Sequence, residues 1–484
     1  MDFFHRGFVL PETMEKYSLR FHKMLIQNYV YFSLSYNNRN MKRGILLIKK
    51  FFALLLIFSI ALGCTACFTK EDNNTSAKTE TTSPFVEEDD SFTDIDIKDE
   101  EKSEYYTPVD ITIGYDSLET EEQRNCYKSL VESISEVSDE VTDNGNYPCK
   151  LVTMEDVVLT QSEIRLVLSA VKMDNPMIFW LTDNFGYSNT NGYTAIQLYS
   201  YETPDKIKSM QNKLMKKVNK FVTSVDSGLG EYERELLAHD KVIESCEYAD
   251  NVKNAEDDYL AFTPYGVLVK GSAVCEGYAK CFQYFLSQLG IKSGTILGMG
   301  SKELHMWNAV LIEDNWYYVD PSWDDGKDYE KYDYFNITTD VLLKDHTISG
   351  EYSCYTSDEI CGAEGIDAVN FNLFIPECYS TDHNYYVKSA THFTDLYSYD
   401  NPDMVNLLYD CANRKDKYFH IYIDPLYLEF TNAADQLFST GDQLFFTYID
   451  TVNSMYPNNY IDKDNIYIVK KEKLSVVTVK LSYQ

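Results

Sequence analysis

The sequence lacks the short motifs that identify many enzyme classes. It contains no Gly-x-Gly-x-x-Gly dinucleotide fingerprint, P-loop, His-Glu-x-x-His zinc motif, EF-hand loop or Gly-x-Ser-x-Gly hydrolase elbow. Basic residues are also scarce, since 43 Lys and Arg stand against 76 Asp and Glu, for a net charge of −33. Nucleic acid is therefore not an expected partner, because phosphate backbones bind clustered basic side chains.

Cysteine is sparse as well. The 11 cysteines in 484 residues show no paired disulfide framework. Cys64 and Cys67 have the Cys-x-x-Cys spacing, but they follow an apolar run that explains them without a metal site. The acidic run at 324–330 lacks the alternating oxygen ligands and the distal Glu of a calcium loop, so we predict a solvated turn there. No metal and no cofactor is predicted.

One apolar run does occur, near the N-terminus. Residues 41–67 combine a basic start, the stretch FFALLLIFSIAL and Gly63 before Cys64, which is the order of zones in a secretory signal peptide. The run is short for a membrane span. It resembles a bacterial lipoprotein signal, which implies lipidation of Cys64. Ordinary cleavage stays open, because the order of Ala61 and Leu62 departs from that signal. Residues 1–40 precede the signal and are expected to be an upstream extension absent from the mature protein.

The composition then changes along the chain. Residues 68–105 are acidic and rich in Ser and Thr, which predicts a disordered linker. Residues 106–229 are predicted to be an α/β lead-in, 230–350 a central core, and the Tyr- and Asn-rich 351–484 an accessory α+β module. The fold class predicted for the whole is α+β.

Local signals within the lead-in are clear. Two capping boxes, Thr120–Gln123 and Thr160–Glu163, each precede apolar residues at helical spacing. The apolar stretch 177–181 is predicted to be a buried strand, and 193–199 alternates as a second one.

Two cysteines lie six residues apart in GSAVCEGYAKCF. Small residues precede Cys275, and apolar residues follow it at helical spacing until Gly290, so Cys275 is predicted at the helix N-terminus and Cys281 inside the helix. The positive end of the helix dipole favours a thiolate at Cys275. Cys281 is predicted to be a small apolar packing residue.

A thiolate needs a histidine and a third, orienting group. The runs 304–312 and 316–320 alternate like two strands of a hairpin. With Glu313 and Asp314 as a two-residue turn, His305 faces Ser322, and Asp320 is a diagonal neighbour of His305. A three-residue turn would place His305 and Asp320 on opposite faces.

These three blocks together resemble the bacterial, exported transglutaminase-like branch of the papain-like cysteine enzymes. The resemblance implies a core in which a helix carrying the cysteine packs on an antiparallel sheet carrying the histidine and aspartate. It implies that Cys275 is the nucleophile, His305 the general base and acid, and Asp320 the residue that orients His305. Trp307 and Trp323 flank this predicted site and are candidate walls of the acyl pocket, with core packing as the alternative. His239 and His346 have no comparable thiol nearby and are interpreted as structural.

The predicted function is acyl transfer or hydrolysis at amide or peptide carbonyls, by an enzyme anchored at a bacterial cell surface. The predicted partners are protein or peptide substrates, including cell-wall peptides, and the membrane through a lipid on Cys64. Two alternatives stay open: a non-catalytic surface module that binds protein or glycan, and a structural lipoprotein with inert cysteines.

Overall fold

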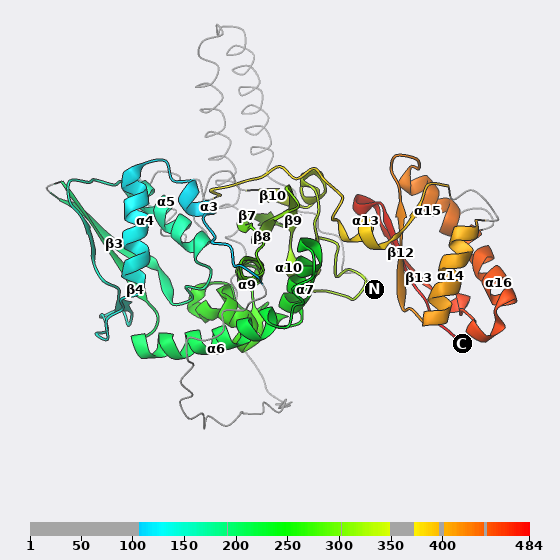
Figure 1. Cartoon of the computed structure of the whole chain (residues 1–484), viewed down its shortest axis with the longest axis horizontal. Coiled ribbons are helices and arrows are strands. Elements are labelled where there is room, and N and C mark those ends of the chain that lie inside the picture. Colours follow the sequence, from blue (N-terminus) through cyan, green and yellow to red (C-terminus); the bar gives the residue numbers. More distant parts are fainter. Residues whose placement is uncertain (1–105, 191, 302, 349–371, 396–400, 440–442) are drawn as a thin grey trace, which may run out of the picture. The chain divides into compact units, whose positions relative to one another are not determined.

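The computed structural model describes residues 106–190, 192–301, 303–348, 372–395, 401–439 and 443–484 (Figure 1). The predicted signal, Cys64, the linker and the upstream extension lie outside these ranges. Within them, no helix is both long enough and apolar enough to cross a bilayer. Helices and sheets alternate throughout, which confirms the mixed α+β prediction.

The lead-in consists of helices packed beside a small antiparallel sheet. Both predicted capping boxes are present, at Thr120 before α4 (Glu121–Ile134) and at Thr160 before α5 (Gln161–Asp174). The sheet has the order β1 (Tyr147–Pro148), β4 (Tyr193–Ser200), β2 (Val152–Met154), and β3 (Leu181–Thr190) also pairs with β4. The long helix α6 (Pro204–Val222) then leads to α7 (Glu231–Ile243).

The predicted strand at 177–181 is wrong for most of its length. β3 begins only at Leu181. Before Leu181, the amide of Ile178 donates to the carbonyl of Asn175, and the amide of Phe179 donates to the carbonyl of Met177. The backbone therefore turns after Pro176 instead of extending. Trp180 is nevertheless buried.

The core places one helix, α9 (Cys275–Gln288), against an antiparallel sheet. The sheet has the order β10 (His346–Ile348), β7 (Ser293–Gly300), β8 (Glu303–Ile312), β9 (Asn315–Val319). The buried side chain of Asn308 donates to the carbonyl of Ala279 at 2.9 Å and so ties β8 to the helix. Gly290, with φ of 78°, follows α9 in the left-handed region that glycine tolerates best.

The β8–β9 hairpin has the predicted register. Ile312 pairs with Asn315, and Asn308 pairs with Val319. Glu313 and Asp314 both have positive φ, 46° and 66°, as a two-residue turn of type I′ requires. The two-residue turn predicted from the sequence is therefore confirmed.

The chain leaves the sheet sooner than predicted. Asp320 caps the short helix α10 (Pro321–Asp324), because Pro321 suits the first helical position. Ser322 consequently does not continue the strand opposite His305. The solvated turn predicted from 324 onward is also wrong at its start, since Asp324 is fully buried, where it contacts His239 and accepts from the amide of Tyr334.

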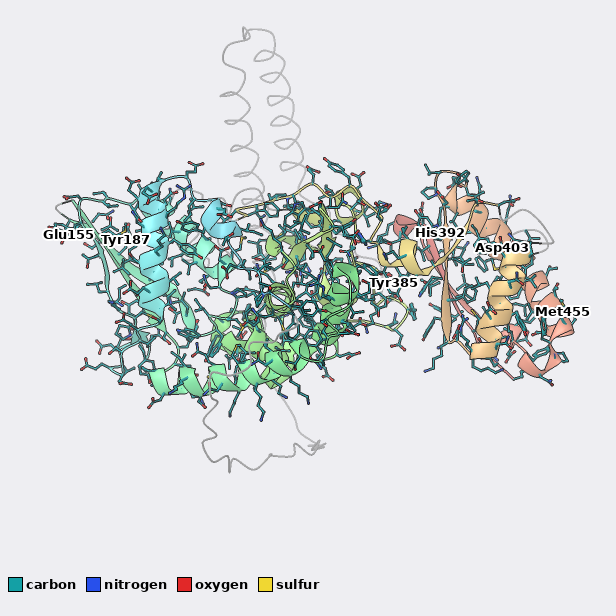
Figure 2. The ribbon with its side chains drawn as sticks, in the orientation of Figure 1. Glu155, Tyr187, Tyr385, His392, Asp403 and Met455 are labelled. Atoms are coloured by element: carbon teal, nitrogen blue, oxygen red, sulfur yellow. The ribbon has the colours of Figure 1, made fainter. Side chains whose placement is uncertain are left out.

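The C-terminal residues form a third sheet with helices. Its order is β11 (Thr391–Phe393), β12 (Tyr418–Ile423), β14 (Val476–Lys480), β13 (Tyr467–Lys471), and the accompanying helices are α13 (Tyr385–Ser389), α14 (Pro402–Arg414), α15 (Phe430–Phe438) and α16 (Leu444–Met455). Tyr385 on α13, labelled in Figure 2, stacks on Tyr332 with ring centroids 3.7 Å apart. Leu474 and Val476 share a hydrophobic cluster with Trp307 of β8, so this sheet packs against the core.

Candidate active site

The structure brings the three predicted site residues together. Cys275 is the first residue of α9, with its side chain partly exposed. His305 lies on β8, and its Nε2 is 2.6 Å from Oδ2 of Asp320. The Cys275 thiol lies close enough to the same imidazole to help raise the pKa of His305. Because Nε2 is engaged by Asp320, Nδ1 is left for proton exchange with the thiol.

Asp320 is held by both of its oxygens. Oδ1 accepts from the amide and hydroxyl of Ser322, at 3.1 and 2.8 Å, and from the amide of Trp323 at 3.2 Å. Oδ2 faces His305 at 2.6 Å and His346 at 3.3 Å. A carboxylate so thoroughly bonded has one orientation, and it fixes the orientation of the imidazole that it contacts.

The electrostatics favour a charged pair of Asp320 and His305. Burial lowers the pKa of His305, but the charge and hydrogen bond of Asp320 and the proximity of Cys275 outweigh it and raise that pKa above its ordinary value. Burial raises the pKa of Asp320, but His305 and His346 outweigh it and hold that pKa well below its usual range. An imidazolium beside a cysteine is the arrangement that stabilises a thiolate.

The second thiol of the stretch GSAVCEGYAKCF, that of Cys281, is different. Cys281 is 1% exposed and lies in the main hydrophobic cluster, as predicted. Burial raises the pKa of Cys281 well above the ordinary thiol value. All seven cysteines of the described ranges are free, and among them Cys275 is the least buried.

His346, interpreted from the sequence as structural, adjoins the site, which the sequence did not indicate. Its ring lies 5.5 Å from that of His305, between centroids, and shares the Asp320 carboxylate with it. His346 belongs to β10, which pairs with β7, and His346 itself lies opposite Gly300 of β7. Gly300 is the sequence signal: a Cβ there would meet Trp323 at 2.8 Å and His305 at 3.1 Å, and a strand glycine indicates such close approach.

His305, Asp320 and His346 are the one group of three potential metal ligands in the described ranges, with ligand atoms within 4.8 Å of one another. The 2.6 Å between His305 and Asp320 is the length of a hydrogen bond. Two ligands about 2.1 Å from a tetrahedral zinc ion would be about 3.4 Å apart. We therefore assign a proton network at this position.

The predicted pocket walls need correction. Trp307 is fully buried in a core cluster, and Trp323 packs its ring edge-on to Tyr334, so neither lines the cavity beside Cys275. Of the two alternatives weighed for these tryptophans, core packing is the one observed. Strand alternation explains it for Trp307, which lies two residues from His305 on the inward face of β8.

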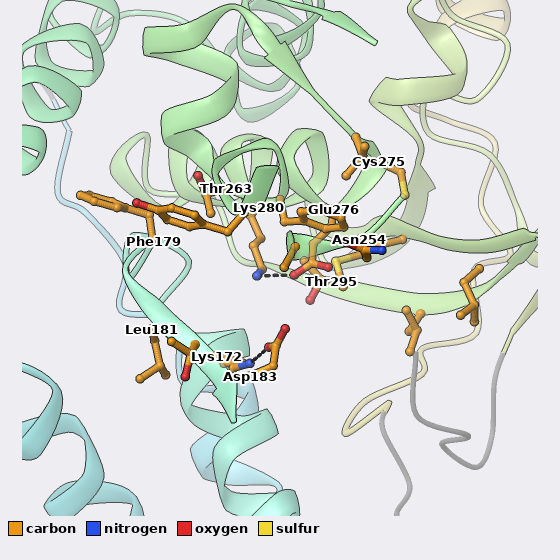
Figure 3. Close-up of a pocket in the computed structure, with 18 of the residues that line it drawn as sticks. Lys172, Phe179, Leu181, Asp183, Asn254, Thr263, Cys275, Glu276, Lys280 and Thr295 are labelled. Atoms are coloured by element: carbon orange, nitrogen blue, oxygen red, sulfur yellow. Dashed lines mark hydrogen bonds and ion pairs between the residues drawn. The ribbon is translucent and has the colours of Figure 1, made fainter. Parts of the chain in front are cut away.

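A cavity of about 530 Å³ opens beside Cys275 and His305. Figure 3 shows that its lining comes from two regions of the chain, with Leu181 and Asp183 from β3 and with Cys275 and Glu276 from α9. Ion pairs of Lys172 with Asp183 and of Lys280 with Glu276 lie in this cavity (Figure 3). The lead-in therefore forms one wall of the site, which the sequence did not indicate.

Tyr248 is a further neighbour that the sequence analysis missed. It ends β5 (Glu247–Tyr248), which pairs with β6 (Ser272–Ala273) just before Cys275. The Tyr248 phenol lies close to Cys275, since both the backbone and the side chain of Cys275 affect the pKa of this phenol. Burial and the charge of Cys275 raise the pKa of Tyr248, so the phenol stays protonated and can donate. A two-residue parallel pairing has no recognisable sequence signature.

The helix-borne cysteine, the strand-borne histidine and the aspartate at the strand end agree with the comparison to known families. Residues 219–321 match the model of the transglutaminase-like superfamily. Over these residues the chain is similar to the transglutaminase-like superfamily.

Similar proteins include two curated relatives. The kyphoscoliosis peptidase of Mus musculus is 31% identical over 126 residues, 21% of this chain and 19% of the mouse protein. That of Homo sapiens is 32% identical over 83 residues, 15% of this chain and 13% of the human protein. The chain thus spans less than a fifth of the length of these relatives. A crystal structure of a TGase aligns over 36% of this chain and 50% of that chain, at 14% identity and a TM-score of 0.22.

Proposed function

We propose that this transglutaminase-like chain is a cysteine enzyme that transfers or hydrolyses acyl groups at amide carbonyls. The observation that carries the proposal is the contact series from the Cys275 thiol through His305 to Asp320 at the start of α9. A helix N-terminus, an imidazole and a fully bonded carboxylate are the three elements that a thiol nucleophile requires.

The proposed reaction has two steps. The Cys275 thiolate attacks the carbonyl carbon, and the C–N bond breaks as His305 gives its proton to the leaving amine, which forms a thioester. An amine or water then attacks the thioester, His305 takes its proton, and the thiolate leaves. An amine acceptor gives transglutamination, and water gives hydrolysis. Asp320 keeps Nε2 of His305 bonded throughout, so that Nδ1 exchanges the proton.

Two donors are available for the oxyanion of each tetrahedral intermediate. The backbone N–H of Cys275 is at a helix start that no side chain caps, and the Tyr248 hydroxyl lies close to Cys275. We propose that both donate to the carbonyl oxygen as it gains charge, since such donors act most strongly in the transition state.

Replacing Tyr248 by Phe tests this assignment. We expect kcat to fall about a hundred-fold with little change in KM, because an oxyanion donor acts after the substrate has bound. Steady-state kinetics measure both constants. Tyr259→Phe is the matched control, since Tyr259 lines the same cavity but bonds Glu202. A raised KM with unchanged kcat in the Tyr248 variant would instead assign this tyrosine to substrate binding.

We propose a protein or peptide as the acyl donor. The cavity is open to Cys275 and lined by both apolar side chains and ion pairs, which suits an amide-bearing side chain or a peptide segment. Cell-wall peptides and surface proteins are the candidates that export would bring within reach.

Export itself is a proposal that rests on residues 41–67. If the signal is a lipoprotein signal, expression in a bacterium with radiolabelled palmitate should label the membrane fraction, and Cys64→Ala should abolish that label. Cys67→Ala is the control, because the lipid is expected only on the cysteine after Gly63. Release of unlabelled protein from both the parent chain and the Cys64→Ala variant would favour ordinary cleavage.

The activity test uses the full chain with a fluorescent primary amine and an amide-bearing protein. Incorporation of the amine identifies a transferase, and release of ammonia or peptide identifies a hydrolase; Cys275→Ala is the blank for both. If the parent chain and this variant are equally inactive across protein and wall-peptide donors, while the parent still binds one of them, the chain is a binding module.

A further inference from the structure

A second imidazole rests on the carboxylate that orients His305. His346 is 3% exposed, and its Nε2 faces the same Oδ2 of Asp320 that His305 contacts. Its other nitrogen, Nδ1, lies 2.8 Å from Oδ1 of Asp345. An imidazole donates from both nitrogens only as the cation, so two flanking carboxylates favour a charged His346.

The series of contacts continues into the C-terminal sheet. Oδ2 of Asp345 accepts from the Tyr334 hydroxyl at 2.8 Å and pairs with Nζ of Lys473 at 2.9 Å. The Lys473 ammonium also lies 3.8 Å from the centroid of the Tyr334 ring. The backbone carbonyl of Lys473 accepts a hydrogen bond from Nζ of Lys344 at 3.2 Å. Lys473 is thus fixed by charge, ring and backbone contacts together.

The segment that carries Lys473 is anchored on both sides. Lys471 is 6% exposed, pairs with Asp333 and donates to the Tyr386 hydroxyl at 2.8 Å. Leu474 is buried in the cluster that contains Trp307. A buried lysine is stable only where charges and hydrogen bonds compensate it, which holds for Lys471. Because Lys471 and Leu474 are both anchored, the position of Lys473 between them is closely determined.

We propose that Lys473, Asp345 and His346 form a clamp that positions Asp320, and through it His305, so that the C-terminal sheet sets the reactivity of Cys275. The clamp rests on the proposed function of Cys275 and His305. His346 and Lys473 are positioning residues. The titratable and charged groups around His346 are Asp320 and His305 of the site, Asp345 and Tyr334 beside it, and Lys473 beyond Asp345.

The direction of the effect follows from charge. A cationic His346 shares Asp320 and repels the His305 imidazolium. Without it, the carboxylate binds His305 alone, and His305 keeps its proton to higher pH. Loss of the Lys473 ammonium leaves the cluster more negative, which also raises the pKa of His305. The increase is smaller, because Lys473 acts through Asp345.

The test measures alkylation of Cys275 by iodoacetamide against pH in the full chain, with the modified peptide identified by mass. The upper transition of this profile reports proton loss from His305, so it must vanish in His305→Gln. We expect His346→Gln to raise the transition by about one pH unit. Lys473→Met should raise it by a smaller, measurable amount, and Lys473→Arg should restore it. Lys470→Met is the control, because Lys470 pairs with the partly exposed Asp435 instead.

The outcomes separate the two proposals. Should His346→Gln not fold, Lys473→Met decides alone, because the Lys473 side chain is 23% exposed and its loss leaves no large cavity. Normal Cys275 labelling with an unmoved transition in the folded variants overturns the clamp and leaves the proposed function intact. Labelling that does not select Cys275, or a profile that ignores His305, overturns both.

Discussion

Replacing Cys275 by Ala is expected to reduce acyl transfer or hydrolysis by at least about a thousand-fold. A group that forms the covalent intermediate cannot be substituted by its neighbours, and loss of a nucleophile typically leaves only the residual effect of binding and of the oxyanion donors. Initial rates with the protein or wall-peptide donor that gives the highest activity measure the loss. The fold should be unaffected, because the side chain is partly exposed and leaves no buried void.

Cys281→Ala is the matched control in the same helix. Its thiol is buried in the hydrophobic cluster, so we expect lower stability, by about 1 kcal/mol, with activity retained in the folded protein. If Cys281→Ala removed activity and Cys275→Ala did not, the assignment of the nucleophile would be reversed. A thermal melt of each variant distinguishes lost chemistry from lost structure.

Asp320→Asn should lower kcat on the order of a thousand-fold. An amide presents one oxygen and one N–H₂ group, whereas Asp320 accepts bonds on both oxygens. In one orientation the N–H₂ group of the amide meets the donors from Ser322 and Trp323, and in the other it meets His305 and His346. In either case His305 loses its orientation or its tautomer. The loss should appear in kcat at every pH, as expected for an orienting residue.

Ser322→Ala separates this effect from helix capping. It removes the 2.8 Å hydroxyl bond to Oδ1 of Asp320 but keeps both backbone amides on that oxygen. We therefore expect less than a ten-fold change in kcat. The free energy of unfolding should fall by about 1 kcal/mol, which would appear as a small decrease in melting temperature. A loss as large as that of Asp320→Asn would mean that the cap, rather than contact with His305, determines the rate.

The parts of this site that the sequence predicted are those fixed by local chemistry. The start of α9 follows from the pattern after Cys275, and the His305–Asp320 contact follows from a two-residue turn and strand alternation. The boundary at 177–181 and the path after Asp320 were wrong, because Pro176 and Pro321 dictated turns that apolar patterning does not register.

The missed residues depend on pairings between distant segments. His346 reaches Asp320 because β10 joins β7 on the side away from β8, and Lys473 arrives 128 residues after Asp345. Tyr248 and the β3 wall of the cavity likewise depend on how separate elements pack. Hydrophobic periodicity specifies which face of an element is buried, but it does not specify which element it is buried against.

The tight turn at Glu313 and Asp314 has an evolutionary consequence. One inserted residue there would shift every later position of β9 to the opposite face of the sheet and carry Asp320 away from His305. Surface hairpin tips ordinarily accept length variation readily. Here a single added codon would be as damaging as a substitution in the site itself, so homologous chains should keep this tip at constant length while its residue types drift.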